Sequence, residues 1–449
     1  MKRTLAIVAT CLVFCGIVFA QKNSTVPQPR ADRLPPVSEA KPSRGRLVDK
    51  PATVMPTAPA GFTVNVYAEL EAPRMMVYAP NGDLFVSSPA ANNITVFRDA
   101  NNDGVFEARG VYADRSTFPA PANAAGRGAQ APALNGPPSV NGPILGAKAP
   151  ACVPPPPFSN RGPGGIDAPF GMAFHDGYLY VGNTGSLVRF TYANGDMKAQ
   201  GAPEKLLDLP VGGHSTRNIV FNRAGTKMYL AVGSQSNNNA GEDCRRAAVL
   251  EFNPDGSGYR VYASGIRNPV GLTLQPGTDT LWVAMNERDN LGDDLVPDYA
   301  TSLKDGGFYG WPYSYIGANY DPRYVGAFPD LVKRAIVPDV LIPAHSAALG
   351  IAFYTGTQFP QKYRGGAFVG LHGSWNRSVA SGYKVVYFQM NNGKPGPIED
   401  FLTGFLVDDG SGGEGISRWG RPVGVTVGRD GSLLVSDDGG NRIWKVTAK

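Results

Sequence analysis

Long apolar runs, cysteine, histidine and charge are all scarce in this chain of 449 residues. Beyond its N-terminal segment, no stretch has the roughly 18 uninterrupted apolar residues that a membrane-spanning helix needs, so we expect no transmembrane span in the mature chain. The four cysteines form no Cys-x-x-Cys-His sequence, which excludes covalently attached haem, and no Cys/His group has the spacing of structural zinc. The net charge of +5 includes no basic block, so nucleic acid is not an expected partner.

Turn-forming residues are abundant instead. The chain has 56 Gly and 39 Pro, which favour many turns over long helices, and its 42% hydrophobic content is enough for a large core. The composition therefore predicts one large all-β domain.

The first 20 residues have the layout of a cleavable secretory signal. Lys2 and Arg3 precede a mostly apolar stretch, residues 5–18, which is followed by a candidate cleavage site after Ala20. We therefore expect residues 1–20 to be a signal peptide and the mature protein to be periplasmic or secreted.

Two of the four cysteines, Cys11 and Cys15, lie within this predicted signal peptide. A lipoprotein anchor at Cys15 is the alternative to cleavage, although Phe14 stands where such signals normally carry a small residue. Once the signal is removed, Cys152 and Cys244 remain as an even pair in an oxidising compartment. Whether they form a disulfide stays open.

Two segments have compositions that cannot bury enough apolar surface to offset their ordering entropy. Residues 21–60 are rich in Pro, Ser, Ala and charge, and we interpret them as a flexible leader. Residues 114–165, approximately, are dominated by Ala, Pro and Gly and are interpreted as a loop insertion. The β domain is expected to span residues 61–449.

A short apolar sequence of one shape returns six times in this domain. The copies are APRMMVY at Ala72, APFGMAF at Ala168, STRNIVF at Ser215, NPVGLTL at Asn268, AALGIAF at Ala347 and RPVGVTV at Arg421. Each is followed by a turn and a second β-rich run, and often by a third, as expected for an antiparallel meander of three to four strands.

Six such meanders in one chain predict a six-bladed β-propeller, in which no blade is stable alone and the ring leaves only short edges. The last copy has room for only three strands before the chain ends, while residues 62–70 precede the first copy as an unassigned strand. We expect this N-terminal strand to complete the last blade and close the ring. A β-sandwich of similar strand content is the alternative fold.

Functional groups are expected where the innermost strands begin, because these positions converge on one end of the propeller axis. Four of the six residues immediately before the copies are ionisable, in a chain that is only 18% charged. These six positions hold Glu71, Asp167, His214, Arg267, Ser346 and Gly420.

His214 is the candidate general base, since two glycines before it allow a close backbone approach and its imidazole can face the channel mouth. A single histidine is more often structural. Arg267 and Arg421 begin equivalent strands, and their guanidinium forks suit bidentate binding of a carboxylate or phosphate. The alternative for each arginine is an ion pair with an acid at the mouth.

Two polar segments are candidate calcium loops. Residues 286–294 directly follow a strand and offer carbonyl and carboxylate oxygens to a hard cation. Asp99, Asn101 and Asp103 have the oxygen spacing of a calcium loop, yet Gly110 stands where an EF-hand needs its bidentate Glu. A polar hairpin turn is the simpler interpretation of that second segment.

Several motifs together resemble a known family, the soluble quinoprotein (PQQ-dependent) glucose/sorbosone dehydrogenases. The resemblance runs from about Gly61 to Lys449, apart from the insertion, and is densest in GGHSTRN, YASGIRNPVGL, DGGFYGWPYSYIG, LGIAFYTGTQFPQKYRGGAFVGLHGSWNR and RPVGVTVGRDGSLLVSDD. It implies a six-bladed propeller that binds pyrroloquinoline quinone (PQQ) and calcium at the channel mouth and oxidises sugars.

The resemblance also implies roles for residues that match by position. His214 resembles the catalytic base. The implied cofactor-binding residues are Arg267, Asn268, His372, Arg377, Arg418 and Arg421, and the nearest matches to the metal-binding carbonyls are Glu287 and Arg288. His372 stands near a position where glucose-specific relatives have a Lys, and a Gln used by relatives has no counterpart near residues 167–171; both departures bear on the substrate.

The resulting hypothesis is an exported oxidoreductase that oxidises an aldose or a sorbosone-like aldehyde by hydride transfer to PQQ and passes electrons to an external acceptor. A calcium-dependent lactonase on a similar ring is a second possibility, although the mouth offers more arginines than acids. A non-catalytic propeller that binds a carbohydrate or protein is the third.

Overall fold

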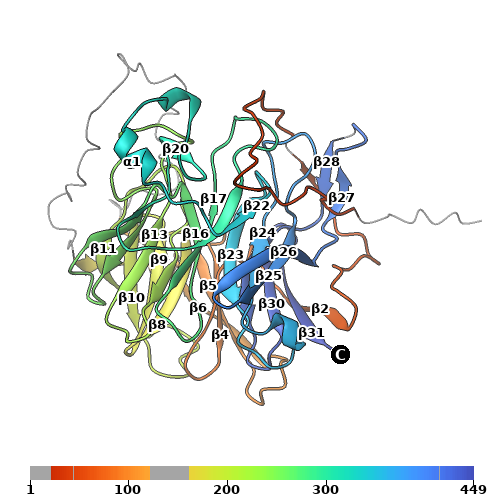
Figure 1. The fold of residues 1–449 in the computed structure, drawn as a ribbon. Helices are drawn as coiled ribbons and strands as arrows, with labels where there is room; N and C mark the ends of the chain where they lie inside the picture. Colours follow the sequence, from red (N-terminus) through yellow and green to blue (C-terminus); the bar gives the residue numbers. More distant parts are fainter. Residues whose placement is uncertain (1–21, 44, 122–160, 414) are drawn as a thin grey trace, which may run out of the picture.

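The regular secondary structure of the polypeptide is almost entirely β-strand (Figure 1). The computed structural model describes residues 22–43, 45–121, 161–413 and 415–449. Within these ranges the helical elements are α1 (Pro329–Lys333) and the single turns η1 (Pro322–Tyr324) and η2 (Gln361–Tyr363). The all-β prediction is therefore confirmed. None of the helices in the described ranges is long and apolar enough to cross a membrane.

Six sheets of four or five strands hold most of the described strands, and we number them I to VI in chain order. Sheet I contains β3 (Met76–Tyr78), β4 (Leu84–Ser88), β5 (Asn93–Arg98) and β6 (Ala108–Asp114). Sheet II contains β8 (Pro169–His175), β9 (Tyr178–Asn183), β10 (Ser186–Thr191), β11 (Glu204–Asp208) and β7 (Gly162–Pro163). Sheet III contains β12 (Ile219–Phe221), β13 (Met228–Val232), β14 (Ala248–Phe252), β15 (Arg260–Ser264) and β19 (Gly307–Phe308).

The remaining sheets continue the series. Sheet IV contains β16 (Asn268–Leu274), β17 (Leu281–Asn286), β18 (Asp298–Ser302) and β22 (Val340–Ile342). Sheet V contains β23 (Ala348–Phe353), β24 (Ala367–Leu371), β25 (Lys384–Asn391) and β26 (Lys394–Leu402). Sheet VI contains β29 (Pro422–Val427), β30 (Leu433–Asp437), β31 (Arg442–Ala448) and, from the other end of the chain, β2 (Phe62–Glu69). Two small sheets join β1 (Arg46–Leu47), β28 (Ile416–Arg418) and β27 (Leu406–Asp409), and β20 (Ser314–Tyr315) with β21 (Asn319–Tyr320).

Each of the six repeat copies supplies one edge strand of one large sheet. These strands are β3, β8, β12, β16, β23 and β29. We call these the first strands. They contact one another in a closed series, from β3 to β8 and on to β29, which contacts β3 again. The end of this ring at which the first strands begin is called the mouth below.

A glycine in the repeat explains how the first strands approach so closely. Gly171, Gly271, Gly350 and Gly424 occupy the fourth position of their copies, and the ladder to the second strand shifts register around each of them. A Cβ on Gly350 would lie 2.6 Å from the carbonyl oxygen of Val423 on the next first strand. Any larger residue would therefore push neighbouring sheets apart.

The core follows from the same arrangement. Apolar residues of adjacent sheets pack between their faces, and a small cluster of Met75, Val270, Leu349 and Val423 joins four first strands near the centre of the ring. Because these side chains fill the centre, the charged groups at the start of the strands are supported from below by apolar packing.

The segment interpreted as a flexible leader contacts the mouth loops. The backbone N–H of Ser38 donates to Leu291, that of Ser43 to Trp375 and that of Val48 to Arg418. In addition, β1 pairs in parallel with β28 (Figure 1, red to orange trace). The N-terminal segment therefore joins three loops that surround the mouth. The predicted signal peptide and most of the predicted insertion lie outside the described residues.

Candidate functional site

His214 lies in the connection between β11 and β12, at the mouth. Gly212 and Gly213 precede it with positive φ angles of 83° and 62°, and a Cβ on Gly213 would collide with the backbone of Gln235. The two glycines thus let the loop pass tightly against the neighbouring segment before the imidazole emerges.

The hydrogen bonds of His214 define its tautomer. Its Nδ1 lies 2.9 Å from the carbonyl oxygen of Ser234, and because a carbonyl can only accept, Nδ1 carries the proton. No residue in the described part of the chain hydrogen-bonds to Nε2, so its lone pair is available at a partly exposed ring. Burial, followed by the positive charge of Arg267, lowers the pKa of His214 to about 3. The imidazole is therefore neutral near pH 7.

Arg267 is buried and fully engaged by the protein. Its guanidinium donates to the carbonyl oxygen of Asn237 (2.9 Å), to the Asn237 side chain (3.0 Å) and to the carbonyl oxygen of Glu287 (2.8 Å). Asp289 lies 3.4 Å away. Arg267 therefore forms the ion pair with an acid that was the alternative to ligand binding, and it contributes fixed positive charge beside His214.

Two further side chains, Asp289 and His345, complete this side of the mouth. His345 Nδ1 faces Asp289 Oδ1 at 3.2 Å and Nε2 faces the carbonyl oxygen of Gly292 at 2.9 Å. The Asp289 carboxylate and the Gly292 carbonyl oxygen can both accept a hydrogen bond from His345 only if both ring nitrogens carry a proton, that is, if the ring is an imidazolium. Burial acts to lower the pKa of His345, but the hydrogen bond and charge of Asp289 outweigh it and raise this pKa.

Asn268, the first residue of β16, is oriented by Asn286, which accepts a 2.8 Å hydrogen bond from its Nδ2. Its Oδ1 is buried without a hydrogen-bond partner in the described ranges. A buried amide oxygen of this kind is a site where a ligand donor or ordered water is expected.

A second group of charges surrounds His372, at the end of β24. His372 Nε2 lies 2.7 Å from Asp438, which also binds Arg74 at 3.0 Å. Arg421 donates to the carbonyl oxygens of His372 (3.0 Å) and Gly373 (3.1 Å). Burial and then Arg421 lower the pKa of His372 to about 4. The carboxylate of Asp438 stays ionised: burial acts to raise its pKa, but His372 and Arg74 hold it well below its usual range.

Arg418 extends this group toward the N-terminal segment. It donates to the carbonyl oxygen of Gly45, and its guanidinium lies 5.7 Å from the centre of the Tyr383 ring. The Nε atoms of Arg418 and Arg74 are both buried, and neither has a hydrogen-bond partner among the residues described.

Of the other predicted site residues, Glu287 and Arg288 lie in the loop after β17, and Arg377 follows β24 and binds that loop. None of the three lies among the arginines around His372. Glu287 and Arg288 have fully buried side chains that pair with each other at 2.9 Å, and Arg288 also pairs with Asp321 at 3.0 Å. Arg377 binds the same loop through Asp294 at 2.7 Å. Three carbonyl groups of the loop, those of residues 287, 292 and 293, accept hydrogen bonds from Arg267, His345 and Arg377.

Comparison with known proteins finds two matching family models. The family model described as glucose/sorbosone dehydrogenase matches residues 182–374, and a second model, TrAA12-like, matches residues 332–449. Residues 182–374 thus resemble the glucose/sorbosone dehydrogenases. The predicted resemblance is thereby confirmed.

Individual relatives match the chain only in part. A PQQ-dependent pyranose dehydrogenase of Coprinopsis cinerea is 27% identical over 51% of this chain and 39% of its own length. An aldose sugar dehydrogenase of Escherichia coli is 26% identical over 34% of this chain and 44% of its own length. An uncharacterized protein of Borreliella burgdorferi is 33% identical over 52% of this chain and 60% of its own length. The chain thus spans less than two thirds of each of these relatives.

Solved structures show the same fold over a longer range. The holo PQQ domain of the Coprinopsis cinerea pyranose dehydrogenase superposes with a TM-score of 0.66 and 20% identity, covering 89% of this chain and 98% of that domain. A calcium structure of a Trichoderma reesei family AA12 enzyme gives 0.65 and 17%, covering 88% and 97%. At these identities the likeness concerns the fold.

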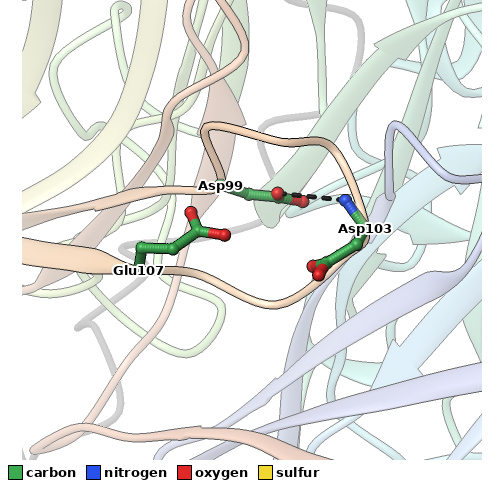
Figure 2. Close-up of side chains that lie close together, drawn as sticks. All are labelled: Asp99, Asp103 and Glu107. Carbon is green, nitrogen blue, oxygen red and sulfur yellow. Dashed lines mark hydrogen bonds between the residues drawn. The ribbon is translucent and has the colours of Figure 1, made fainter.

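One acidic cluster lies away from the mouth, in the turn between β5 and β6 (Figure 2). Asp99, Asp103 and Glu107 bring carboxylate oxygens within 4.8 Å of one another. The Asp99 oxygens accept from the backbone N–H groups of Asp103 (3.2 Å) and Gly104 (2.7 Å), and Glu107 accepts from Ala100. These bonds are those of a polar hairpin turn, and Glu107 is the acid that the spacing of Asp99, Asn101 and Asp103 alone did not indicate.

Only one cysteine of the pair Cys152 and Cys244 lies within the described residues. Cys244 is disulfide-bonded, while Cys152 lies outside the described ranges.

Sequence reasoning missed Arg74 and Arg217, and a signal for both was present. Each stands at the third position of its repeat copy, where the other four copies have an apolar residue. Arg74 binds Asp438 beside His372, and Arg217 lies beneath His214. Asp289, His345 and Asp438 lie in loops whose approach to the mouth depends on the tertiary structure.

Proposed function

We propose that the protein is an exported PQQ-dependent dehydrogenase that oxidises an aldose or a sorbosone-like, sugar-derived aldehyde. Its six sheets are the blades of a six-bladed propeller, closed by pairing of β2 with β31. The observation that carries the proposal is the mouth itself, where a neutral histidine with a free Nε2 lies on the same ring as several arginines. The aldose sugar dehydrogenase and the PQQ-dependent pyranose dehydrogenase among the relatives support the same chemistry.

The residues around the mouth fit a planar quinone that carries three carboxylates. Such a group needs several fixed cations, which Arg74, Arg418 and Arg421 provide. The buried, unpaired Nε atoms of Arg74 and Arg418 and the unpaired Oδ1 of Asn268 are the polar contacts that a bound ligand would complete. His372 would lie beside these arginines.

Calcium would be held by the loop of residues 286–294. Main-chain oxygens of Glu287 and Arg288 remain the proposed ligands, with the carboxylate of Asp289 as the acid nearest to His214 in this loop. Arg377 binds Asp294 of the same loop and would stabilise its conformation.

The chain's own residues would then act as follows. Bound PQQ supplies a two-electron quinone that accepts hydride. His214 Nε2 takes the proton from the hydroxyl of the carbon that is oxidised, while Ser234 holds the Nδ1 proton and so the required tautomer. Arg267 and the imidazolium of His345 place positive charge where negative charge develops. Electrons leave to an external acceptor.

The proposal is tested by reconstitution. The purified protein is incubated with PQQ and calcium, and bleaching of an artificial electron acceptor is followed with a panel of aldoses and sugar-derived aldehydes. We expect turnover that requires both PQQ and calcium and is lost by at least about 1,000-fold in His214→Gln, in line with removal of a general base and its positioning. His175→Gln is the matched control, because His175 ends β8 at the end of the ring opposite the mouth and stacks on Phe221.

Two outcomes would reject the proposal in favour of its alternatives. Metal-dependent lactone hydrolysis without added quinone would assign the site to a lactonase. Glycan binding without any binding of PQQ in calorimetry would assign the ring to a non-catalytic binding protein.

A further inference from the structure

Arg217 is a fully buried guanidinium at a position that the fold does not require to be charged. The equivalent positions of four other repeat copies hold Phe170, Val270, Leu349 and Val423, all apolar. Burying an arginine is costly unless its charge is compensated, and no carboxylate forms an ion pair with Arg217 in the described part of the chain. A requirement other than packing must therefore retain it.

The hydrogen bonds of Arg217 all go to main-chain carbonyl groups of one short loop. It donates to the carbonyl oxygens of His214 (2.9 Å), Thr216 (2.8 Å) and Pro210 (2.6 Å). Since residues 210 and 214 both lie in the connection between β11 and β12 that carries His214, one planar group fixes two points of this loop at once.

A second buried arginine, Arg246, joins the same loop to the segment that sets the tautomer of His214. Arg246 donates to the carbonyl oxygens of Val211 and Gly233. The residue after Gly233 is Ser234, whose carbonyl oxygen accepts from both the backbone N–H (3.0 Å) and the Nδ1 of His214 (2.9 Å). The two arginines thus hold both sides of the hydrogen bond that defines which ring nitrogen carries the proton.

We propose that Arg217 and Arg246 are positioning residues that hold the His214 loop from beneath through its carbonyl groups, and so fix the orientation and tautomer of His214. The significance of this role for catalysis rests on the proposed function, but the positioning itself does not. The charged groups that face His214 are Arg267 and Asp289 from the neighbouring sheet and Arg217 from its own, with Arg246 beside Arg217. Their net positive charge, together with burial, keeps the imidazole neutral.

The test uses the protein without added cofactor and observes the histidines by NMR. The chain has four histidines, and the signal of His214 is identified by its loss in His214→Gln. In the unmodified protein we expect the ring nitrogens to report a single tautomer with the proton on Nδ1 and no titration between about pH 5 and pH 8. In Arg217→Met and Arg246→Met we expect a mixture of tautomers and a midpoint moved up by about one pH unit or more.

Two further variants separate positioning from general stability. Arg217→Lys keeps the charge but loses the planar fork, so its tautomer mixture should resemble that of Arg217→Met while its titration shifts less. Arg189→Met is the matched control, because Arg189 is a largely buried arginine on β10 that binds Glu204 and Tyr180 instead of the loop. This control should leave the His214 signals unchanged. If Arg217→Met does not fold, Arg246→Met and Arg217→Lys carry the test.

Activity gives a separate readout. After reconstitution with PQQ and calcium, kcat of the folded Met variants should fall at least about 10-fold while KM changes less than about 3-fold, because a misoriented base slows the chemical step and not the binding of sugar. Unchanged tautomer and titration of His214 in both Met variants would overturn the inference even if the enzyme turns over sugar. Absence of turnover in the unmodified protein would overturn the proposed function and leave the NMR result to stand on its own.

Discussion

At the scale of single residues, the histidines at the mouth are set in opposite charge states by their neighbours. His214 is neutral beside Arg267, and His372 is neutral because burial and Arg421 outweigh its contact with Asp438. His345 lies between Asp289 and a carbonyl oxygen, both of which accept, and is an imidazolium. Histidine has an ordinary pKa near the physiological range, so such contacts decide its role. The mouth therefore contains a neutral imidazole, with the lone pair of Nε2 unshared, and a fixed cation within the same group of side chains.

These charge states predict how stability depends on pH. The pKa values of His214 and His372 fall from 6.5 to about 3 and about 4 on folding, in both cases first because of burial. Between these values and 6.5 the unfolded chain binds more protons, so stability is fully present above about pH 6.5 and is lost as the pH falls. We expect His214→Gln and His372→Gln each to reduce the loss of unfolding free energy between about pH 7 and pH 5 by about 1 to 2 kcal/mol, as measured by urea unfolding.

His345→Gln provides the contrast, because the pKa of His345 is raised in the folded protein. Its contribution is present below the ordinary pKa and is lost as the pH rises, so this variant should cost more stability at about pH 5 than at about pH 8. The same pH dependence in all three variants would contradict the assigned charge states.

A buried ion-pair network yields another prediction at this scale. Arg288 is fully buried and forms ion pairs with the carboxylates of Glu287 and Asp321. Arg288→Met would therefore leave two buried carboxylates without this partner. We expect a loss of about 3 to 5 kcal/mol in unfolding free energy. Arg323→Met, which removes a more exposed arginine 3.7 Å from Asp321, should cost less than about 1 kcal/mol; an equal cost would argue against the network.

At the scale of elements, each seven-residue copy of the repeat contains both residues that pack in the core and residues that lie at the mouth. Their third and fourth positions pack at the centre of the ring, and their leading residues face the mouth. The alternation of β-formers, the turns before the second strands and the sixfold recurrence predicted these strands from the sequence. The register shift around the glycine was not predicted, since it arises from the close approach of the next strand and not from local propensity.

Gly350→Ala tests this packing. The added methyl group would meet the carbonyl oxygen of Val423 at 2.6 Å, so we expect a loss of about 2 to 4 kcal/mol in thermal or urea unfolding, as for other overpacked core positions. Gly201→Ala is the control, because nothing lies within 4 Å of a Cβ built on Gly201. Equal stability of the two variants would show that the first strands can move apart without cost.

At the scale of the whole molecule, the N-terminal segment connects loops that belong to different sheets. Its backbone bonds to Leu291, Trp375 and Arg418 reach three loops around the mouth, and β2 pairs with the last strand of the chain. Contacts of this kind bring together parts of the sequence that are several hundred residues apart, and they limit the relative movement of the mouth loops.

Removal of residues 22–48 should therefore loosen the mouth while leaving the ring folded. We expect faster hydrogen exchange in residues 289–294 and 372–378, measured by mass spectrometry, with no change in β9 and β10 on another sheet. Uniformly faster exchange would instead indicate that the segment stabilises the fold as a whole. Unchanged exchange would mean that its contacts are not maintained in solution.

The sequence by itself determined the fold class and indicated the resemblance to glucose/sorbosone dehydrogenases, because the sixfold period of the apolar repeat encodes strands that recur in similar sheets. It also indicated His214, Arg267 and Arg421, which depart from their equivalents in other copies. Only the tertiary structure decided which groups meet these side chains: Asp289 and His345 beside Arg267, Asp438 and Arg74 beside His372, and Arg217 beneath His214. The physical reason is that charge and tautomer depend on distances between separate sheets and loops, and such distances are fixed only when the first strands assemble around a common centre.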